Sequence, residues 1–334
     1  MDLLPNADQQ QFAEIADDFL TRELPVGRLR RARLDGAAEV RAAAQMGWLG
    51  VALTEAVGGS GMSVADELLI FREAGKRLAS PAVLATTVAA QLAAEAGETE
   101  LAHAFLGGRP AAFAHGLERQ PRGELGGGFL LLDGAQADHV VVWTIEGLQL
   151  LEAPRGAGRT AAACVDDSVP AERVDLAQAR PLAAAEALAP AADRARVLAA
   201  GLMVGMAQAC RDMAGDYAKV REQFGRPIGA FQAIKHKCAD MVVRAESAQA
   251  QAMFAAAAAA GQRADAAFHS ISAKIIATRA AFDNARGNIQ VHGAMGFTVE
   301  CDAHWHLKRA HVLDQLGGQA KQQQALLLKT PPSL

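Results

Sequence analysis

The sequence predicts a mainly α-helical fold that carries a small β-domain in the middle of the chain. Apolar residues recur at helical spacing over residues 8–97, short apolar runs follow, and long helical patterns return from residue 191. A chain of 334 residues suits two or three packed units. We therefore expect an N-terminal helical domain (1–106), a small β middle domain (107–190) and a C-terminal helical bundle (191–334).

The N-terminal part has clear helix signals. Over residues 12–20 the apolar residues repeat at three- and four-residue steps, which is typical of an amphipathic helix. Pro81 is expected to open a helix with Ser80 as its cap, since proline is tolerated at the first helical position. A glycine-rich loop over residues 58–61 is followed by another helix that begins near Ser63.

The middle part changes to the pattern of short strands. Residues 129–133, 139–143 and 148–151 are apolar runs separated by Gly, Asp and Ala. Such runs predict antiparallel strands joined by tight turns, and residues 165–174 are a further candidate strand. The domain is short for one that has to enclose a ligand alone.

The C-terminal part predicts four long helices. The first runs to Arg221 and is broken by Gly225, Pro227 and Gly229, because proline lacks an amide donor and glycine permits a turn. Three further helices are expected over residues 230–260, 264–293 and 301–313. Helices of this length bury their apolar faces as an antiparallel bundle.

Composition excludes several classes of protein. A net charge of -4 with 21% charged residues does not suit a nucleic-acid-binding protein. No apolar stretch reaches the roughly 18 residues of a membrane span, and the N-terminus lacks the basic region of a secretory signal. Four scattered cysteines without a Cys-x-x-Cys pair indicate reduced thiols. We therefore expect a cytoplasmic protein that binds neither membrane nor nucleic acid.

Three segments together resemble the acyl-CoA dehydrogenase family. Residues 220–241 (VREQFGRPIGAFQAIKHKCADM) are similar to the segment that follows the first helix of the family's C-terminal bundle. Residues 290–310 (QVHGAMGFTVECDAHWHLKRA) resemble its second signature, and residues 46–63 resemble its glycine loop near the acyl pocket. The resemblance implies an acyl-CoA dehydrogenase-like fold with a reduced β middle domain and a C-terminal four-helix bundle. It also implies FAD, α,β-dehydrogenation of an acyl-CoA from fatty-acid or sterol side-chain catabolism, and an electron-accepting flavoprotein.

The first segment offers groups that suit a dinucleotide. A guanidinium such as that of Arg221 presents a fixed fork of donors to a pyrophosphate, Gln223 can hydrogen-bond a phosphate or sugar, and Phe224 offers a flat face to a purine. The resemblance implies that these three residues, Phe231 and Gln232 touch the ADP half of an FAD bound mainly by a neighbouring subunit. The alternative is a helix stop, with Arg221 favouring the helix dipole and Phe224 in the core.

The second segment, from Gln290 to Gly296, resembles the family pattern Gln-x-x-Gly-Gly-x-Gly. Its glycines would let backbone amides approach a phosphate, with Gln290 and Gly293 as FAD contacts. Ala294 replaces the second family glycine and weakens that contact. The alternative, compatible with the first, is a helix C-cap at Gly293 and a turn at Gly296.

The carboxylate that the family reaction needs is missing from both of its usual places. A glutamate there removes the α-proton as general base. Ala195 stands directly before Arg196, which resembles the arginine beside the acyl thioester, and Leu316-Gly317-Gly318 stands where the family has Tyr-Glu-Gly. Asp193 and Asp314 are the nearby carboxylates and are weak candidates for the base. Alternatively, Asp193 is an N-terminal cap or dipole partner and Arg196 a solvated charge.

Three hypotheses follow from these departures. The family's flavin-ring motif is also absent, since residues 114–119 read AHGLER in its place. The leading hypothesis is therefore a heteromer in which a homologous acyl-CoA dehydrogenase subunit supplies the catalytic glutamate. The second is a self-associating dehydrogenase with an unconventional base, and the third is a non-catalytic structural or regulatory subunit.

Two further patterns have simpler interpretations. His304 and His306, two residues apart, face different ways on a helix, so with His311 they do not predict a metal site. Gly201 and Gly205 form a small-xxx-small step that favours close packing of two helices.

Overall fold

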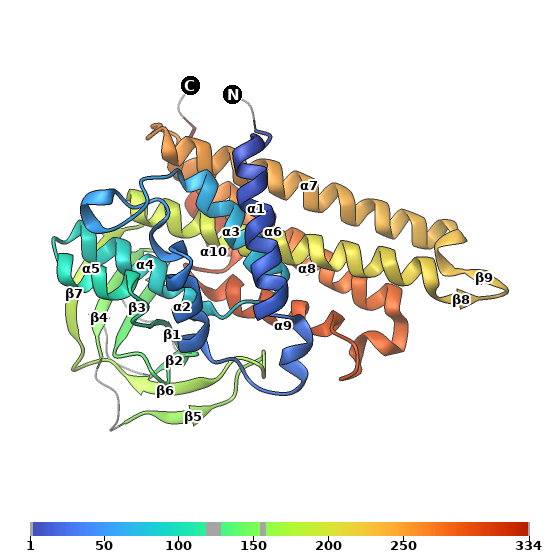
Figure 1. Cartoon of the computed structure of the whole chain (residues 1–334), viewed down its shortest axis with the longest axis horizontal. Helices are drawn as coiled ribbons and strands as arrows, with labels where there is room; N and C mark the ends of the chain where they lie inside the picture. The colour runs from blue at the N-terminus through green and yellow to red at the C-terminus, as the bar shows by residue number, and fades with distance from the viewer. Residues whose placement is uncertain (1–2, 118–127, 154–157, 333–334) are drawn as a thin grey trace.

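The computed structural model describes residues 3–117, 128–153 and 158–332, and it confirms a mainly helical fold with a small sheet (Figure 1). The helices before the sheet are α1 (Ala7–Glu23), α2 (Gly36–Gln45), α3 (Val64–Lys76), α4 (Pro81–Glu95) and α5 (Thr99–Leu106). The two predicted helix starts are confirmed. The Ser63 side chain forms a capping box with Asp66, and the Ser80 hydroxyl accepts the amide of Ala82 beside Pro81.

The described part of the middle domain forms a sheet of seven strands in the order β5-β6-β2-β1-β3-β4-β7. They are β1 (Ala111–Gly116), β2 (Gly128–Leu132), β3 (His139–Thr144), β4 (Gly147–Glu152), β5 (Thr160–Ala162), β6 (Ala171–Asp175) and β7 (Arg180–Glu186). The predicted antiparallel pairing is confirmed for β3 and β4. The sheet as a whole is mixed, because β1, which was not predicted, pairs in parallel with β3. The candidate strand over residues 165–174 is partly wrong. Its strand begins only at Ala171, and the preceding residues turn to bring Asp166 to a buried arginine.

The bundle contains α6 (Pro190–Val220), α7 (Gln232–Ala260), α8 (Ala266–His292) and α9 (Ala303–Gln315), followed by a shorter α10 (Ala320–Leu327). Between α6 and α7 the chain forms a hairpin of two short strands, β8 (Glu222–Gln223) and β9 (Arg226–Pro227). Figure 1 shows this hairpin projecting from one end of the bundle, away from the seven-stranded sheet. Within the described chain, no helix is both long and apolar enough to cross a membrane.

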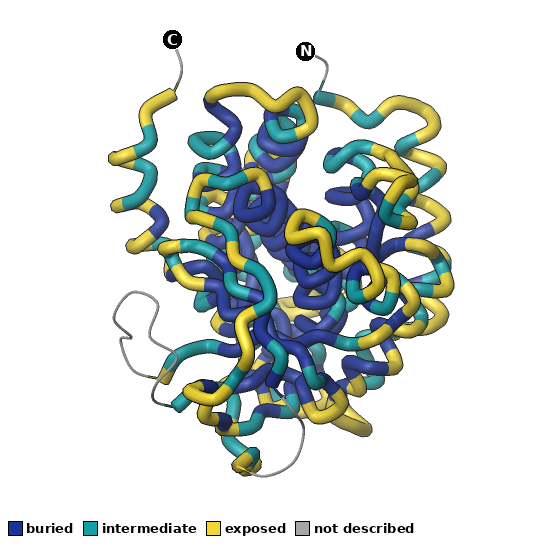
Figure 2. Tube along the Cα trace, turned by 90° about the vertical axis from the view of Figure 1, so that its left-hand side faces the viewer, coloured by how far each residue is buried: buried dark blue, intermediate teal, exposed yellow. Residues whose placement is uncertain are grey.

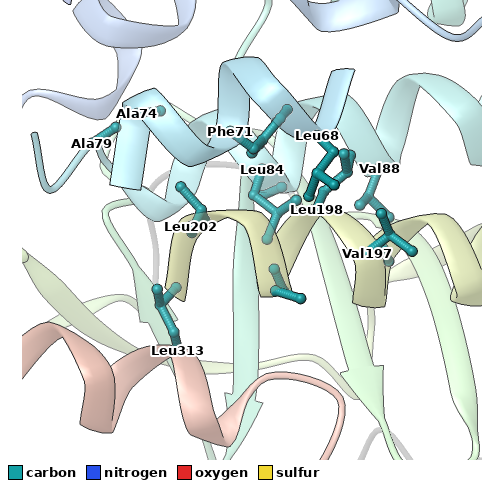
Figure 3. Close-up of a cluster of buried hydrophobic side chains, with 14 of the residues drawn as sticks. Leu68, Phe71, Ala74, Ala79, Leu84, Val88, Val197, Leu198, Leu202 and Leu313 are labelled. Carbon is teal, nitrogen blue, oxygen red and sulfur yellow. The ribbon is translucent and has the colours of Figure 1, made fainter. Parts of the chain in front are cut away.

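The core is tightest where α3 crosses α6. A Cβ atom on Gly205 would lie 1.8 Å from the Arg72 carbonyl oxygen, and one on Gly75 would lie 2.0 Å from the Leu202 oxygen. The two backbones therefore touch, which confirms the close packing predicted from Gly201 and Gly205. Figure 3 shows apolar side chains of α3, α4 and α6 interdigitating around this crossing.

Two buried arginines join the parts of the chain. Arg194 on α6 donates to Glu67 of α3, with Nε 2.6 Å from Oε2, and also to Gln91 of α4. Arg309 on α9 donates to Asp166 (2.7 Å) and to the backbone oxygen of Leu78 (2.9 Å). Removing one partner of such a pair would leave a buried charge without a counter-charge and lower the free energy of unfolding by about 3–5 kcal/mol. Figure 2 shows that buried segments fill the interior of the molecule and that exposed segments lie mostly at its periphery.

Candidate functional site

The hairpin between α6 and α7 exposes the first group of predicted FAD residues. Phe224 (φ 54) and Gly225 (φ 78) both adopt left-handed conformations, as a two-residue type I′ turn requires. This conformation is unfavourable for a bulky residue, yet the Phe224 side chain is 92% exposed and gains no burial in return. The alternative that placed Phe224 in the core is wrong, because the turn directs the chain outward.

Neighbouring side chains shape the hairpin surface. The rings of Phe224 and Phe231 meet edge to face with centroids 6.0 Å apart, and the Arg226 guanidinium lies 4.3 Å above the Phe231 ring. Arg221 caps the end of α6 through its own amide, and its side chain is exposed, as is that of Gln223. Gln232 is exposed at the start of α7. The structure therefore gathers aromatic faces, a guanidinium and amide side chains on one solvent-facing surface.

The second predicted segment lies at the end of α8. Gly293 is the C-cap with φ 64 and ψ -142, a conformation essentially restricted to glycine, which confirms the predicted cap. Gln290 is exposed one turn earlier, and a Cβ atom on Gly296 would lie 2.7 Å from the Ile289 oxygen. A surface hollow of about 420 Å³ opens here. It is lined by Arg286, Ile289, Gln290, Gly293, Ala294, Phe297 and Leu307.

The two segments adjoin at this end of the bundle. The rings of Tyr217 and His292 stack at 4.2 Å, and these residues lie four before Arg221 and two after Gln290. This contact was not predicted from the sequence. The available signal was the single tyrosine of the chain, which lies on α6 one turn before the hairpin. The donors and rings on the surface fit the pyrophosphate and purine of an ADP group. Their role as FAD contacts remains a prediction.

The predicted thioester-side residues are enclosed in the core instead. Arg196 is 1% exposed, and its guanidinium donates to the Asp193 carboxylate (3.2 Å) and to the Ala187 oxygen. Asp193 also accepts the Ser270 hydroxyl at 2.6 Å. The alternative of Arg196 as a solvated charge is wrong, and so is Asp193 as the cap, because α6 begins earlier with Ala189 as its N-cap.

Burial sets the ionisation of this pair. Burial raises the pKa of Asp193, while Ser270 and Arg196 oppose the shift. Burial also lowers the pKa of Arg196 to about 10, although Asp193 favours its charged form. In this conformation the pair is a structural ion pair, and the substrate role of Arg196 remains a prediction.

Lys274 on α8 is a buried cation that sequence reasoning missed. Its ammonium donates to the Gly318 oxygen at 2.8 Å and lies 3.5 Å from the Asp314 oxygen. Burial lowers the pKa of Lys274 to about 7; the Asp314 charge opposes the shift and the Arg196 charge adds to it. The sequence held one signal for this burial. Lys274 lies three residues after Ile271 and four before Thr278, which are both buried, so the three share the inner face of the helix.

The second family position for the base is closed by backbone geometry. Gly317 has φ 68, and a Cβ atom there would lie 2.4 Å from the Trp143 ring. Its amide donates to the Trp143 oxygen at 3.1 Å, so the loop is tied to β3. Asp314 is half-buried and accepts the amide of Ala320 at the start of α10. A glutamate at Gly317 therefore needs a different loop.

The first family position is closed as well, since Ala195 is fully buried on α6. In the stretch that replaces the flavin-ring motif, Ala114 and His115 lie in β1, and burial lowers the pKa of His115. Glu118 and Arg119 lie outside the described residues.

The candidate metal ligands do not gather. His304 Nδ1 lies 2.9 Å from the Cys301 oxygen, His306 is fully buried, and the His311 ring packs against Phe282. In the portion of the chain that the structure describes, no group of three or more His, Cys, Asp or Glu side chains is arranged to hold a metal ion.

Family models match most of the chain. The acyl-CoA dehydrogenase N-terminal domain matches residues 6–108, and the acyl-CoA dehydrogenase C-terminal domain matches residues 186–330. The chain belongs to the acyl-CoA dehydrogenase family, whose members are FAD-dependent oxidoreductases that act on acyl-CoA.

Curated relatives agree with this assignment. Acyl-CoA dehydrogenase FadE34 of Mycobacterium tuberculosis is 37% identical over 296 residues, covering 83% of this chain but only 40% of the relative. Acyl-CoA dehydrogenase IpdE2 of the same organism is 32% identical over 277 residues, covering 81% of this chain and 79% of the relative.

Solved structures share the fold. The Tcur3481-Tcur3483 steroid ACAD has a TM-score of 0.82 at 24% identity and covers 97% of both chains. The ChsE4-ChsE5 complex from Mycobacterium tuberculosis has a TM-score of 0.80 at 23% identity and covers 100% of both chains. At these identities the likeness concerns the fold alone.

Proposed function

We propose that this chain is a flavoprotein subunit of an acyl-CoA dehydrogenase that lends its outer surface to an FAD held mainly by a homologous partner. The partner supplies the catalytic glutamate. The observation that carries this proposal is the exposed, conformationally unfavourable Phe224 beside Arg221, which forms a surface built for contact outside the chain. The inner base position of the same chain is closed by Trp143 and Gly317.

Each outer residue has a role toward the ADP half. The Arg221 guanidinium donates to the pyrophosphate, and Phe224 with Phe231 covers the purine. Gln223 and Gln232 hydrogen-bond the phosphate or sugar edges. At the adjoining hollow, Gln290 donates to the ligand and Gly293 allows close backbone approach.

The partner has to supply the groups that carry out the reaction itself. A carboxylate must remove the α-proton of the acyl-CoA, and FAD, when bound, supplies the acceptor for the β-hydride. In this chain Asp193 is engaged by Ser270 and Arg196, and Asp314 holds the start of α10. Both carboxylates thus already hold hydrogen-bonding partners within the chain, which supports a base from elsewhere.

Two solved relatives support the finer points of the proposal. One is named as a complex of two components, ChsE4 and ChsE5, and this favours a heteromeric assembly. The other is named a steroid ACAD, and this favours a CoA thioester of a sterol-derived acyl group. An electron-accepting flavoprotein completes the proposed reaction.

The test begins with the chain purified alone and then co-purified with its partner from the native host. We expect the chain alone to be colourless and inactive in acyl-CoA-dependent dye reduction, and the complex to be yellow and active. Yellow, active protein from the chain alone would overturn the heteromer and favour the self-sufficient alternative. A complex without flavin would favour the structural-subunit alternative.

Arg221→Ala tests the outer surface directly. We expect this variant to lower the FAD content of the complex, because a charge-assisted contact to phosphate is worth about 1.5–3 kcal/mol. Arg211→Ala is the matched control, since Arg211 lies on the same helix and pairs only with Asp212 and Glu246 among the described residues. Equal FAD content in the two variants would contradict the role of Arg221.

A further inference from the structure

One face of α8 leads directly into the surface hollow. Arg286, Ile289, Gln290 and Gly293 are spaced three, four and seven residues from the first, so they line up on a single face of the helix, and all four line the hollow. Gln290 and Gly293 already belong to the proposed ADP surface. Of the described residues that line the hollow, Arg286 is the charged one.

The Arg286 guanidinium is available for a ligand. Its side chain is 62% exposed, and its ion pair among the described residues, with Asp283, spans 3.6 Å. An exposed ion pair at that separation contributes little to stability, so it does not commit the guanidinium to Asp283. The Phe282 ring supports the guanidinium from 5.4 Å, which orients it without occupying its donors.

Most other residues that line the hollow are apolar, and one is aromatic. Phe297 is 72% exposed, and Ile289, Ala294 and Leu307 line the hollow with it. The volume of about 420 Å³ falls within the range of small-molecule sites, about 300–1,000 Å³. A guanidinium and an exposed ring that line the same hollow suit a phosphate that carries a flat aromatic group.

The hollow is also joined to the hairpin. Leu307 packs in the same apolar cluster as Tyr217 and Ile228, which form the base of the hairpin. Tyr217 in turn stacks on His292, next to Gly293. Packed side chains therefore connect the base of the hairpin, which carries Arg221, with the hollow that Arg286 lines.

We propose that Arg286 is a second phosphate-binding guanidinium of this surface, acting with Arg221 on the ADP half of FAD. The proposal rests on the proposed function, because it assumes that FAD approaches this end of the bundle. It adds a residue outside the two sequence motifs to the surface that the proposed function assigns to the ADP half.

The experiment uses the full chain in complex with its partner, stripped of flavin and titrated with FAD while flavin fluorescence is followed. We expect Arg286→Ala to raise the Kd for FAD about 10- to 100-fold, as loss of a charged hydrogen bond to phosphate does. Arg286→Lys should recover part of the affinity, since it keeps the charge but not the fork of donors.

Arg279→Ala is the matched control. Arg279 lies on α8 two turns earlier, about 10 Å away, and also pairs with Asp283 at 3.6 Å, but it does not line the hollow. The variant removes the same charge and one of the two ion pairs of Asp283, as Arg286→Ala does. Its Kd should stay within about twofold of the unmodified complex.

Competition with ADP and with FMN identifies which half of FAD Arg286 contacts. Arg286→Ala should raise the Kd for ADP by about the same factor as the Kd for FAD and should leave the Kd for FMN unchanged. An unchanged Kd for ADP would overturn the proposal, as would a raised Kd for FMN.

Arg221→Ala separates the two possible failures. If Arg221→Ala weakens FAD binding while Arg286→Ala behaves like Arg279→Ala, only the assignment of Arg286 is wrong. If neither Arg221→Ala nor Arg286→Ala changes the Kd, FAD does not use this surface and the proposed function fails with it.

Discussion

The outer surface at the hairpin and the inner cluster around Lys274 differ in how their polar groups are used. On the outside, Phe224 is 92% exposed and Arg286 has only a 3.6 Å ion pair among the described residues. Inside, Asp193, Arg196 and Lys274 are buried and each has a hydrogen-bonding partner. The groups that the proposed function assigns to another molecule are thus exposed, whereas the charged groups in the interior are already paired within the chain.

The physical reason lies in the cost of burying charge. A surface guanidinium is solvated, so it can remain without a ligand at little cost in the stability of the fold. A buried charge has to be paired, and once it is paired it is unavailable for substrate. The experiments below probe this difference, beginning with the largest expected effect.

Asp193→Asn tests whether the inner pair is structural. The variant leaves the Arg196 guanidinium buried without its carboxylate, so we expect the free energy of unfolding to fall by about 3–5 kcal/mol. Urea denaturation measures this. Asp216→Asn is the control, because Asp216 and Lys219 are both exposed, and it should change stability by at most about 0.5 kcal/mol. A fully stable Asp193→Asn protein would contradict a structural role.

Gly317→Glu tests whether the closed loop excludes the family's base. We expect a loss of at least about 2 kcal/mol in the free energy of unfolding and no dehydrogenase activity in the chain alone, since the side chain meets Trp143. Gly97→Glu isolates the backbone contribution, because Gly97 has φ 80 with open space around it. Adding Trp143→Ala to Gly317→Glu should recover only the part of the stability loss that exceeds the loss in Gly97→Glu. If it recovers none, the clash with Trp143 is not the cause of the loss.

Lys274→Met tests the buried ammonium through pH. The pKa of Lys274 is about 7 in the folded chain against an ordinary value of 10.5, so the unfolded chain binds more protons between these values. Stability should therefore rise with pH across this window, by up to about 1.4 kcal/mol per pH unit, and the contribution is lost as pH falls through 7. The variant should flatten this slope in denaturation at several pH values. Exposed Lys219→Met should leave the slope intact; an equal slope in Lys274→Met would refute the assignment.

Phe224→Gly has the smallest expected effect and separates stability from binding. Glycine relieves the left-handed conformation, so the free energy of unfolding should rise by about 1 kcal/mol while the FAD content of the complex falls. Thermal denaturation and flavin absorbance measure the two effects. Asparagine also tolerates the left-handed conformation, so Phe224→Asn should change stability and FAD content in the same directions. Lower stability together with unchanged FAD content would remove the functional reason for Phe224.

The fold class and the outer residues could be predicted because their signals are local. Ser63 and Ser80 cap helices that start at the next residue, and Gly293 ends α8 as expected. The predicted FAD residues are close neighbours within two short segments, so recognising the segments located them together. The sheet was less predictable, because strand partners such as β1 and β3 depend on contacts between distant residues.

The sequence by itself determined where several helices start and stop, that the family's two glutamate positions are empty, and which residues follow the break after the first bundle helix. Tertiary structure decided which charges are buried and what closes the inner site. Trp143 and Gly317 are far apart in the chain, as are Asp193 and Ser270, and only packing brings them together. Helix signals act over a few residues through the backbone, whereas burial and pairing depend on every element that packs nearby.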